Sequence, residues 1–330
     1  MKLSIVTTLY RSAANIGEFY RRAMQAAEAI ADDVELVMVN DGSPDNGVDL
    51  ALTLQRKDPR IVVVDLSRNF GHYKAMMTGL SHATGDLVFL IDSDLEEKPE
   101  DLTLFHQRFA QGDSDVVYGI QQARRGGFAE RVTGTIFFAL VDALADRPLP
   151  RNLVTARLMT ADYVKALVRH RDREFVISDL WQLTGFRQNA IVVEKLARSA
   201  STYSIWKRID LAVRYLTTTS TRLLYLAFYV GLSIFVISLG IIAYYLARYL
   251  AFGVAVSGYT SQIVSIWFLG GLITLILGIL GIYMANILAE TKRRPYTVVR
   301  GVYRADSSVA AAPNLTLVER TSPADTGTPR

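Results

Sequence analysis

Two carboxylates one residue apart, Asp92 and Asp94, close a strongly apolar run, residues 86–94 (DLVFLIDSD). A short apolar run of this kind is typical of a buried strand, and open α/β sheets bind ligands at the carboxyl ends of their strands. Carboxylate oxygens suit Mg²⁺ or Mn²⁺, which proteins usually share with the phosphates of a substrate. The pattern therefore predicts a divalent metal at a strand end, together with a phosphate-bearing ligand such as a nucleotide.

Two further side chains near this strand end can take part in the same chemistry. Glu96 lies on the same side as Asp94 if the chain stays extended, and it would then be a third metal ligand. The alternative is that LEEKPE begins a solvated helix, because acids are favoured in a first helical turn. Lys74, in the Gly-His-Tyr-Lys sequence at 71–74, can approach a phosphate.

The elements that must position these residues alternate between strands and helices. Strands are expected at residues 3–10, 34–41, 61–67, 86–94 and 115–120, with helical stretches such as 15–31 and 74–83 between them. This alternation predicts βαβ units and a doubly wound, mostly parallel sheet with its ligand site at the carboxyl ends of the strands. Neither GxGxxG after the first strand nor GxxxxGK[ST] occurs, which argues against a dinucleotide fingerprint and a P-loop.

Composition excludes several other kinds of site. The chain of 330 residues has no cysteine, so disulfides, zinc–thiolate sites and a catalytic thiol are excluded. The formal net charge of +4 is small, and no nucleic-acid partner is expected.

Two apolar runs in the second half are long enough to cross a bilayer, which takes about 20 residues. They are Leu223–Leu250 and Ile263–Leu288, joined by a short uncharged segment. Basic residues lie on both outer flanks, at Lys207, Arg208, Arg214 and Arg222 and at Lys292, Arg293, Arg294 and Arg300. The positive-inside rule then predicts two transmembrane helices with both flanks in the cytoplasm.

Several segments together resemble a known family. LSIVTTLYRSAANI, VELVMVNDGSPDN, VVDLSRNFGHYKAMMTGLSHATGDLVFLIDSDLEEKPE and VVYGIQQARRG follow, in order, the landmarks of family 2 inverting glycosyltransferases with the GT-A fold. RLMTADYV, GFRQ and the two apolar runs resemble the polyprenyl-phosphate branch, which includes bactoprenol glucosyltransferases and dolichol-phosphate mannose synthases. The resemblance covers about residues 1–300.

The resemblance implies a nucleotide-sugar donor, with a UDP-sugar favoured, and a polyprenyl phosphate acceptor such as undecaprenyl phosphate. Thr8, Tyr10, Asp41 and Asp92 would line the donor pocket, and Asp94 would coordinate the metal that bridges the donor diphosphate. Asp41 has a second interpretation as a turn residue, because Asn-Asp-Gly-Ser-Pro is turn chemistry.

Arginine binds phosphate oxygens bidentately, so it is the natural clamp for the incoming acceptor phosphate. The candidates are Arg124, Arg131 and Arg157, of which Arg157 matches the arginine of the family's D-F-R-L-M pattern. We count Asp94, Arg131 and Arg157 as the catalytic set, and Arg124 and Lys74 with the donor-binding residues.

Three positions depart from the family pattern. Thr155 stands where the family has an acid, Gln121 and Gln122 replace a basic pair, and Thr202 replaces a lysine. These departures leave open a different acceptor, or a non-catalytic membrane protein that binds sugar nucleotides. A processive polysaccharide synthase is disfavoured because the chain has no QxxRW motif and only two apolar runs.

The expected organisation is a GT-A catalytic domain followed by a two-helix transmembrane hairpin. The catalytic domain would span residues 1–200, a juxtamembrane amphipathic helix 201–222, the two transmembrane helices 223–289, and a cytoplasmic basic segment with a disordered tail 290–330. The protein would lie in a bacterial plasma membrane with its catalytic domain in the cytoplasm, acting in cell-envelope glycan modification. Glycines in the second apolar run permit close helix packing, which is compatible with a homo-oligomer.

Overall fold

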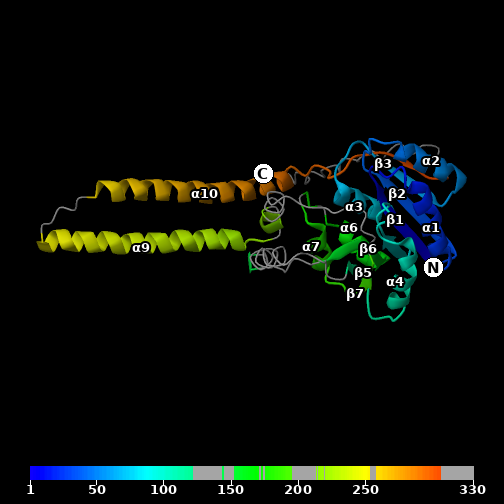
Figure 1. Ribbon diagram of the computed structural model, residues 1–330, viewed down its shortest axis with the longest axis horizontal. Helices are drawn as coiled ribbons and strands as arrows, with labels where there is room; N and C mark the ends of the chain where they lie inside the picture. The colour runs from blue at the N-terminus through cyan, green and yellow to red at the C-terminus, as the bar shows by residue number, and fades with distance from the viewer. Residues whose placement is uncertain are drawn as a thin grey trace, which may run out of the picture.

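The computed structural model describes residues 1–121, 143–144, 152–170, 172–173, 175–194, 213, 215–218, 220–252 and 258–305. Figure 1 shows an α/β domain from which two long helices extend as an antiparallel pair. The strands are β1 (Lys2–Leu9), β2 (Asp33–Asn40), β3 (Ile61–Leu66), β4 (Leu87–Leu90), β5 (Val116–Gln121), β6 (Leu153–Thr160), β7 (Gln188–Val193) and β8 (Val299–Tyr303). The helices are α1 (Ile16–Glu28), α2 (Gly47–Lys57), α3 (His72–His82), the short 3₁₀-helix η1 (Pro99–Asp101), α4 (Leu102–Phe109), α6 (Ala161–Val168), α7 (Ile177–Leu183), α9 (Arg222–Phe252) and α10 (Tyr259–Thr291).

The described strands form one eight-stranded sheet in the order β7-β5-β6-β4-β1-β2-β3-β8. The pairs β1–β2, β1–β4, β2–β3 and β5–β7 are parallel, while β4–β6, β5–β6 and β3–β8 are antiparallel. The five strands expected from the sequence are present. The expectation of a mostly parallel sheet holds for the block β4-β1-β2-β3. The sheet as a whole is mixed, because β6 pairs antiparallel with β4 and β5 and β8 pairs antiparallel with β3.

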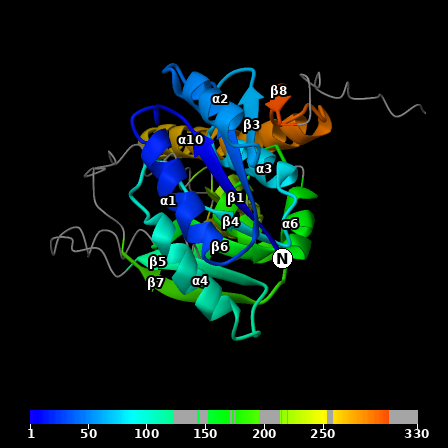
Figure 2. The same cartoon turned by 90° about the vertical axis from the view of Figure 1, so that its right-hand side faces the viewer.

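Helices cover both faces of the sheet, which is why its central strands are apolar almost throughout. Figure 2 shows α1 and α4 on one side of the strands and α3 and α6 on the other. One buried cluster joins α1 and α4 to residues such as Leu3, Ile5 and Phe89, and a second joins α3, α6 and α7 to the opposite face. Gly79 lets α3 approach the sheet closely, because a Cβ there would lie 2.6 Å from Val6 Cγ1 and 2.8 Å from Val39 Cγ2.

The segment after α10 forms β8, whereas we expected residues 290–330 to be a basic segment and a disordered tail outside the catalytic domain. β8 pairs antiparallel with β3 at the edge of the sheet. Ser67 donates its backbone N–H to the carbonyl of Val298 at 2.9 Å, and Arg300 pairs with Asp65 at 3.3 Å. An exposed edge strand has unpaired backbone groups that favour such pairing, so residues 299–303 belong to the same sheet as β1 to β7. Residues 306–330 and most of the expected juxtamembrane helix lie outside the described part of the chain.

Both long helices expected from the apolar runs are present, and both are longer than those runs. α9 has 31 residues and α10 has 33. One described stretch, Phe268–Thr291, is long and apolar enough to cross a membrane, with 24 residues and a mean hydropathy of 2.3. The apolar stretch described in α9, Arg222–Ile234, is shorter. The pair of transmembrane helices is therefore not confirmed by this criterion.

Polar contacts attach the C-terminal part of α10 to the residues before α9 and to the α/β domain. Tyr283 donates to the carbonyl of Ser220 at 2.7 Å, and Glu290 accepts the backbone N–H of Arg173 at 2.6 Å. A cavity of about 260 Å³ between α7 and α10 lies beside these contacts. Because β8 follows within ten residues of this helix end, α10 is joined to the domain at two places.

Candidate functional site

The carboxyl ends of β1, β2 and β4 meet at one edge of the sheet. Leu9, the last residue of β1, is in register with Asn40, the last residue of β2, and Ile91 donates its N–H to the carbonyl of Val6 at 3.1 Å. The residues that follow these strand ends are therefore neighbours in space, although up to 84 positions separate them in the chain. The sequence predicted this edge as the ligand site.

Asp92 is held through both oxygens of its carboxylate. The ring nitrogen Nε2 of His72 lies 3.3 Å from Oδ1, and the hydroxyl of Thr155 donates to Oδ2 at 2.8 Å. The other ring nitrogen, Nδ1, lies 3.0 Å from Oγ1 of Thr8. Desolvation alone would lower the pKa of His72, but the hydrogen bond and charge of Asp92, with Asp41 and Asp94 nearby, raise this pKa above its ordinary value.

Asp94 sits in a tight turn rather than in extended chain. Its Oδ1 accepts the backbone N–H of Glu96 at 2.9 Å, and Leu95 between them has a φ of 62°. The condition under which Glu96 would share the side of Asp94 is therefore not met, because the chain leaves the extended region at Leu95. Asp92, Asp94 and Glu96 are all half-buried, while Ser93 and Leu95 are buried.

Glu97 is a site residue that the sequence did not single out. Its carboxylate is only 3% exposed and accepts the backbone N–H groups of Thr155 and Ala156, each at 2.9 Å. These two bonds fix the N-terminal half of strand β6 against the loop that carries Asp92 and Asp94. Nothing in the run of acids at 96–97 distinguishes the buried glutamate from its neighbour by residue type, so only its position in the fold identifies it.

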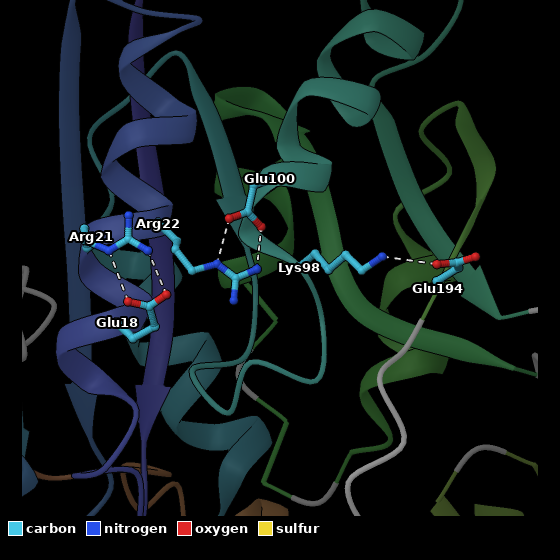
Figure 3. A network of polar contacts seen from close by, with 6 residues as sticks. All are labelled: Glu18, Arg21, Arg22, Lys98, Glu100 and Glu194. Carbon is cyan, nitrogen blue, oxygen red and sulfur yellow. Dashed lines mark hydrogen bonds and ion pairs between the residues drawn. The ribbon is translucent and has the colours of Figure 1, made fainter.

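Ion pairs join the segment that follows Asp94 to α1 and to the end of β7. Arg22 on α1 donates two hydrogen bonds to Glu100, at 2.7 and 2.6 Å, and Lys98 pairs with Glu194 at 3.1 Å, as Figure 3 shows. Exposed ion pairs of this kind contribute at most about 1 kcal/mol each. They therefore orient the loop more than they stabilise the fold.

Asp41 is almost fully enclosed, at 2% exposure. Its two carboxylate oxygens accept the backbone N–H groups of Phe70, at 2.8 Å, and Gly71, at 3.1 Å. Burial raises the pKa of Asp41 above its ordinary value, although these two hydrogen bonds oppose the shift. The carboxylate thus shapes the loop before α3, and its predicted contact with the base or ribose stays a prediction.

Gly42, in the loop after β2, packs directly against the backbone of the loop before α3. A Cβ at Gly42 would lie 2.3 Å from both the carbonyl carbon of Arg68 and the backbone nitrogen of Asn69, and φ at Gly42 is +58°. We expect Gly42→Ala to lower the free energy of unfolding by about 2–3 kcal/mol, because backbone cannot move aside cheaply. Thermal melting of the detergent-solubilised protein measures this.

Gly112→Ala is the matched control, because Gly112 also has a positive φ, of +78°, but a Cβ there meets nothing within 4 Å. Gly112→Ala should lower the free energy of unfolding by about 1 kcal/mol, from the strain of a positive φ alone. Equal melting temperatures for the two variants would contradict the proposed fit.

The other predicted donor-site residues differ in how far they are exposed. Tyr10 is 46% exposed at the end of β1, with the guanidinium of Arg11 5.6 Å from its ring centre. Thr8 is buried and contacts His72, and Lys74 is half-buried in the first turn of α3. The structure places all three at the same edge as Asp92, and their contacts with a donor stay predictions.

Arg157 is buried under α7 rather than presented at the surface. It is 1% exposed, its guanidinium lies over the ring of Trp181, and Nε donates to the carbonyl of Thr155 at 3.3 Å. Burial lowers the pKa of Arg157 to about 10. Among the described residues its Nη2 has no hydrogen-bond partner. Its role as a phosphate clamp stays a prediction, and Arg124, Arg131, Gln122 and Thr202 lie outside the described residues.

The donor set at this edge fits a hard divalent cation. Asp92 and Asp94 supply carboxylate oxygens, each with lone pairs beyond those used by the hydrogen bonds above. In the described part of the chain no three His, Cys, Asp or Glu side chains gather as a metal site, and the role of Glu96 as a third ligand stays a prediction. One or two carboxylates completed by substrate phosphates is the usual protein site for Mg²⁺.

The carboxyl edge of the sheet faces the two long helices. The N-terminus, where β1 begins, lies at the end of the domain opposite α9 and α10 in Figure 1, so β1 runs toward them. The contacts agree, because Ser67, directly after β3, binds Val298, seven residues beyond the end of α10. A ligand at Asp92 and Asp94 would thus be on the helix side of the domain.

The sequence of this chain is similar to those of known glycosyltransferases. The model of glycosyl transferase family 2 matches residues 4–169. The chain is 46% identical over 306 residues to a relative described as putative glycosyltransferases from Mycobacterium tuberculosis, covering 93% of this chain and 90% of the relative. It is 30% identical over 304 residues to the prophage bactoprenol glucosyl transferase homolog of Escherichia coli, covering 92% and 99%.

Among solved structures, S. aureus TarS in complex with UDP-GlcNAc is 17% identical, with a TM-score of 0.42 and coverage of 66% of each chain. The mannosyltransferase PcManGT from Pyrobaculum calidifontis, in complex with GDP-Man and Mn²⁺, is 16% identical, with a TM-score of 0.42 and coverage of 88% and 86%.

Proposed function

Because the chain belongs to glycosyl transferase family 2, we propose that it transfers a sugar from a nucleotide-sugar to a polyprenyl phosphate at the cytoplasmic face of a bacterial plasma membrane. The observation that carries the proposal is that the edge bearing Asp92 and Asp94 faces the long helices. A lipid-linked phosphate can reach such a site without leaving the bilayer surface. The relatives called bactoprenol glucosyl transferase support the same class of acceptor.

The reaction we propose is a single displacement with inversion at the anomeric carbon. The bond from this carbon to the leaving diphosphate breaks, and a bond to an oxygen of the polyprenyl phosphate forms. This oxygen is already an anion at neutral pH, so no general base is required. The enzyme must instead position the two reactants and neutralise their phosphates.

The residues of this chain would divide these tasks. Asp92 and Asp94 would hold Mg²⁺ or Mn²⁺, which stabilises the charge of the leaving diphosphate. Thr8, Tyr10 and Asp41 would form the donor side, with a UDP-sugar favoured, and Lys74 would approach a phosphate. Arg157 and Arg131 would neutralise phosphate on the acceptor side, which requires the guanidinium of Arg157 to become accessible. Arg124 would bind on the donor side.

The proposed membrane arrangement is two spans, α9 and α10, with the catalytic domain in the cytoplasm. The stretch Phe268–Thr291 supports one span. The basic residues Arg222 before α9 and Lys292, Arg293 and Arg294 after α10 support a cytoplasmic location for both outer ends. Cell-envelope glycan modification would be the corresponding cellular role.

Transfer of radiolabelled sugar tests the proposal directly. The full chain in detergent is incubated with UDP-glucose, UDP-galactose, UDP-N-acetylglucosamine or GDP-mannose, with undecaprenyl phosphate and Mg²⁺, Mn²⁺ or EDTA. We expect label in the organic phase from one donor, lost with EDTA. Transfer to water or to a glycan, with none to the lipid, would indicate another acceptor. Nucleotide binding without any transfer would indicate a sugar-nucleotide-binding protein.

A further inference from the structure

His72 and Thr155 hold the carboxylate of Asp92 from opposite sides. His72 opens α3 and contacts Oδ1 through Nε2, while Thr155 on β6 donates its hydroxyl to Oδ2. His72 also contacts Thr8 on β1, so one chain of contacts crosses the carboxyl edge from β1 through α3 and β4 to β6. A carboxylate with only one such contact would be free to rotate about its last side-chain bond.

Thr155 stands where the family has an acid, and its hydroxyl donates to Asp92. A carboxylate at this position would add a second negative charge near Asp92, and like charges disfavour each other's ionisation. A threonine hydroxyl adds no charge and donates a hydrogen bond to the carboxylate. Glu97 holds the backbone of Thr155 in place, so the hydroxyl is itself well positioned.

We propose that His72 and Thr155 are positioning residues that fix both oxygens of Asp92 in the orientation that receives the metal-bound donor. This inference rests on the proposed function. It assigns no direct contact with the reacting atoms to either residue. A carboxylate oxygen has two lone pairs, so a hydrogen bond to it is compatible with binding of a metal ion or a ribose hydroxyl by the same oxygen.

Two substitutions of His72 separate its two contacts. The amide of His72→Gln reaches the position of Nε2 and keeps the bond to Asp92, whereas that of His72→Asn reaches the position of Nδ1 and keeps only the contact with Thr8. At position 155, Thr155→Ser keeps the hydroxyl and Thr155→Val removes it at nearly constant volume. Each pair therefore compares a variant that holds Asp92 with one that does not.

We expect His72→Asn and Thr155→Val each to lower kcat/KM for the nucleotide-sugar about 10- to 100-fold, the usual effect of losing a partner of a metal-binding side chain. His72→Gln and Thr155→Ser should retain most of the activity. KM for undecaprenyl phosphate and the melting temperature should stay near wild type in all four variants. Calorimetric titration with UDP or GDP in the presence of Mn²⁺ should show weaker binding for His72→Asn and Thr155→Val only.

Three outcomes would overturn the inference. His72→Asn could bind and turn over like wild type, His72→Gln could fail as badly as His72→Asn, or the losses could follow the melting temperature. If wild type transfers no sugar at all, the proposed function fails, but calorimetry with UDP or GDP and Mn²⁺ still tests whether the two pairs of variants differ. The two failures are therefore distinguishable.

Discussion

Asp94→Asn should reduce sugar transfer about 10²- to 10³-fold, with donor binding in the presence of metal weakened as well. An amide has one neutral oxygen in place of an anionic carboxylate, so it binds Mg²⁺ or Mn²⁺ poorly. Charge on the leaving diphosphate then lacks its main stabilisation, and losing such an electrostatic contact typically costs about 3–4 kcal/mol in the transition state. Initial rates of transfer at saturating Mn²⁺, with each donor of the panel, measure this.

The fold should survive this change, because Asp94 is half-buried and the amide oxygen of asparagine can still accept the N–H of Glu96. Asp86→Asn is the matched control. Asp86 precedes the same strand at its opposite end, where its carboxylate accepts the backbone N–H of Lys2 at 2.8 Å. We expect Asp86→Asn to transfer sugar at the wild-type rate. Full activity of Asp94→Asn would remove Asp94 from the metal site.

Glu97→Ala should destabilise the protein strongly, and more than the loss of an exposed charge from the neighbouring helix η1. It leaves the buried backbone N–H of Ala156 and the partly buried N–H of Thr155 without an acceptor, and a buried group of this kind costs about 1–3 kcal/mol. A total near 3 kcal/mol corresponds to about 5–10 °C in melting temperature for a domain of this size. Activity should fall too, because β6 then no longer presents Thr155 firmly to Asp92.

Glu100→Ala is the control for the loss of a nearby exposed charge, from η1. Glu100 pairs with Arg22 at 2.6 Å, but its side chain is 53% exposed. Removing it should lower stability by less than about 1 kcal/mol, as for other exposed pairs. If Glu97→Ala melted no lower than Glu100→Ala, the two hydrogen bonds that Glu97 accepts from β6 would contribute far less than we infer.

The sequence predicted where the site lies in the sheet, but not which side chains contact Asp92 there. Apolar runs followed by polar residues identified β1 to β5 and the acids after β4, because strand burial and strand ends leave a short-range pattern. His72 and Thr155 left no such pattern. They meet Asp92 only because α3 and β6 pack beside β4, and position 155 is 63 residues from Asp92 in the chain.

Glu96 and Glu97 are adjacent in the chain, and the local sequence could not distinguish their roles. The sequence favoured Glu96 as a ligand on the assumption of an extended chain, and the positive φ of Leu95 removes that assumption. Glu97, which did not stand out, is the buried residue that binds β6. The fold at that turn depends on β6, which is distant in sequence, so a local pattern cannot distinguish the two acids.

By itself, the sequence determined the class of this protein: an α/β domain with two carboxylates at a strand end, two long apolar helices, and a resemblance to family 2 glycosyltransferases that the comparisons confirm. Strand burial, strand ends and apolar helix length are local properties, so neighbouring residues are enough to encode them. Only the tertiary structure decided that β6 enters antiparallel between β4 and β5, that β8 returns to β3, and that Arg157 is buried against Trp181. These depend on pairings between segments far apart in the chain, whose partners are chosen by the packing of the whole domain rather than by any one segment.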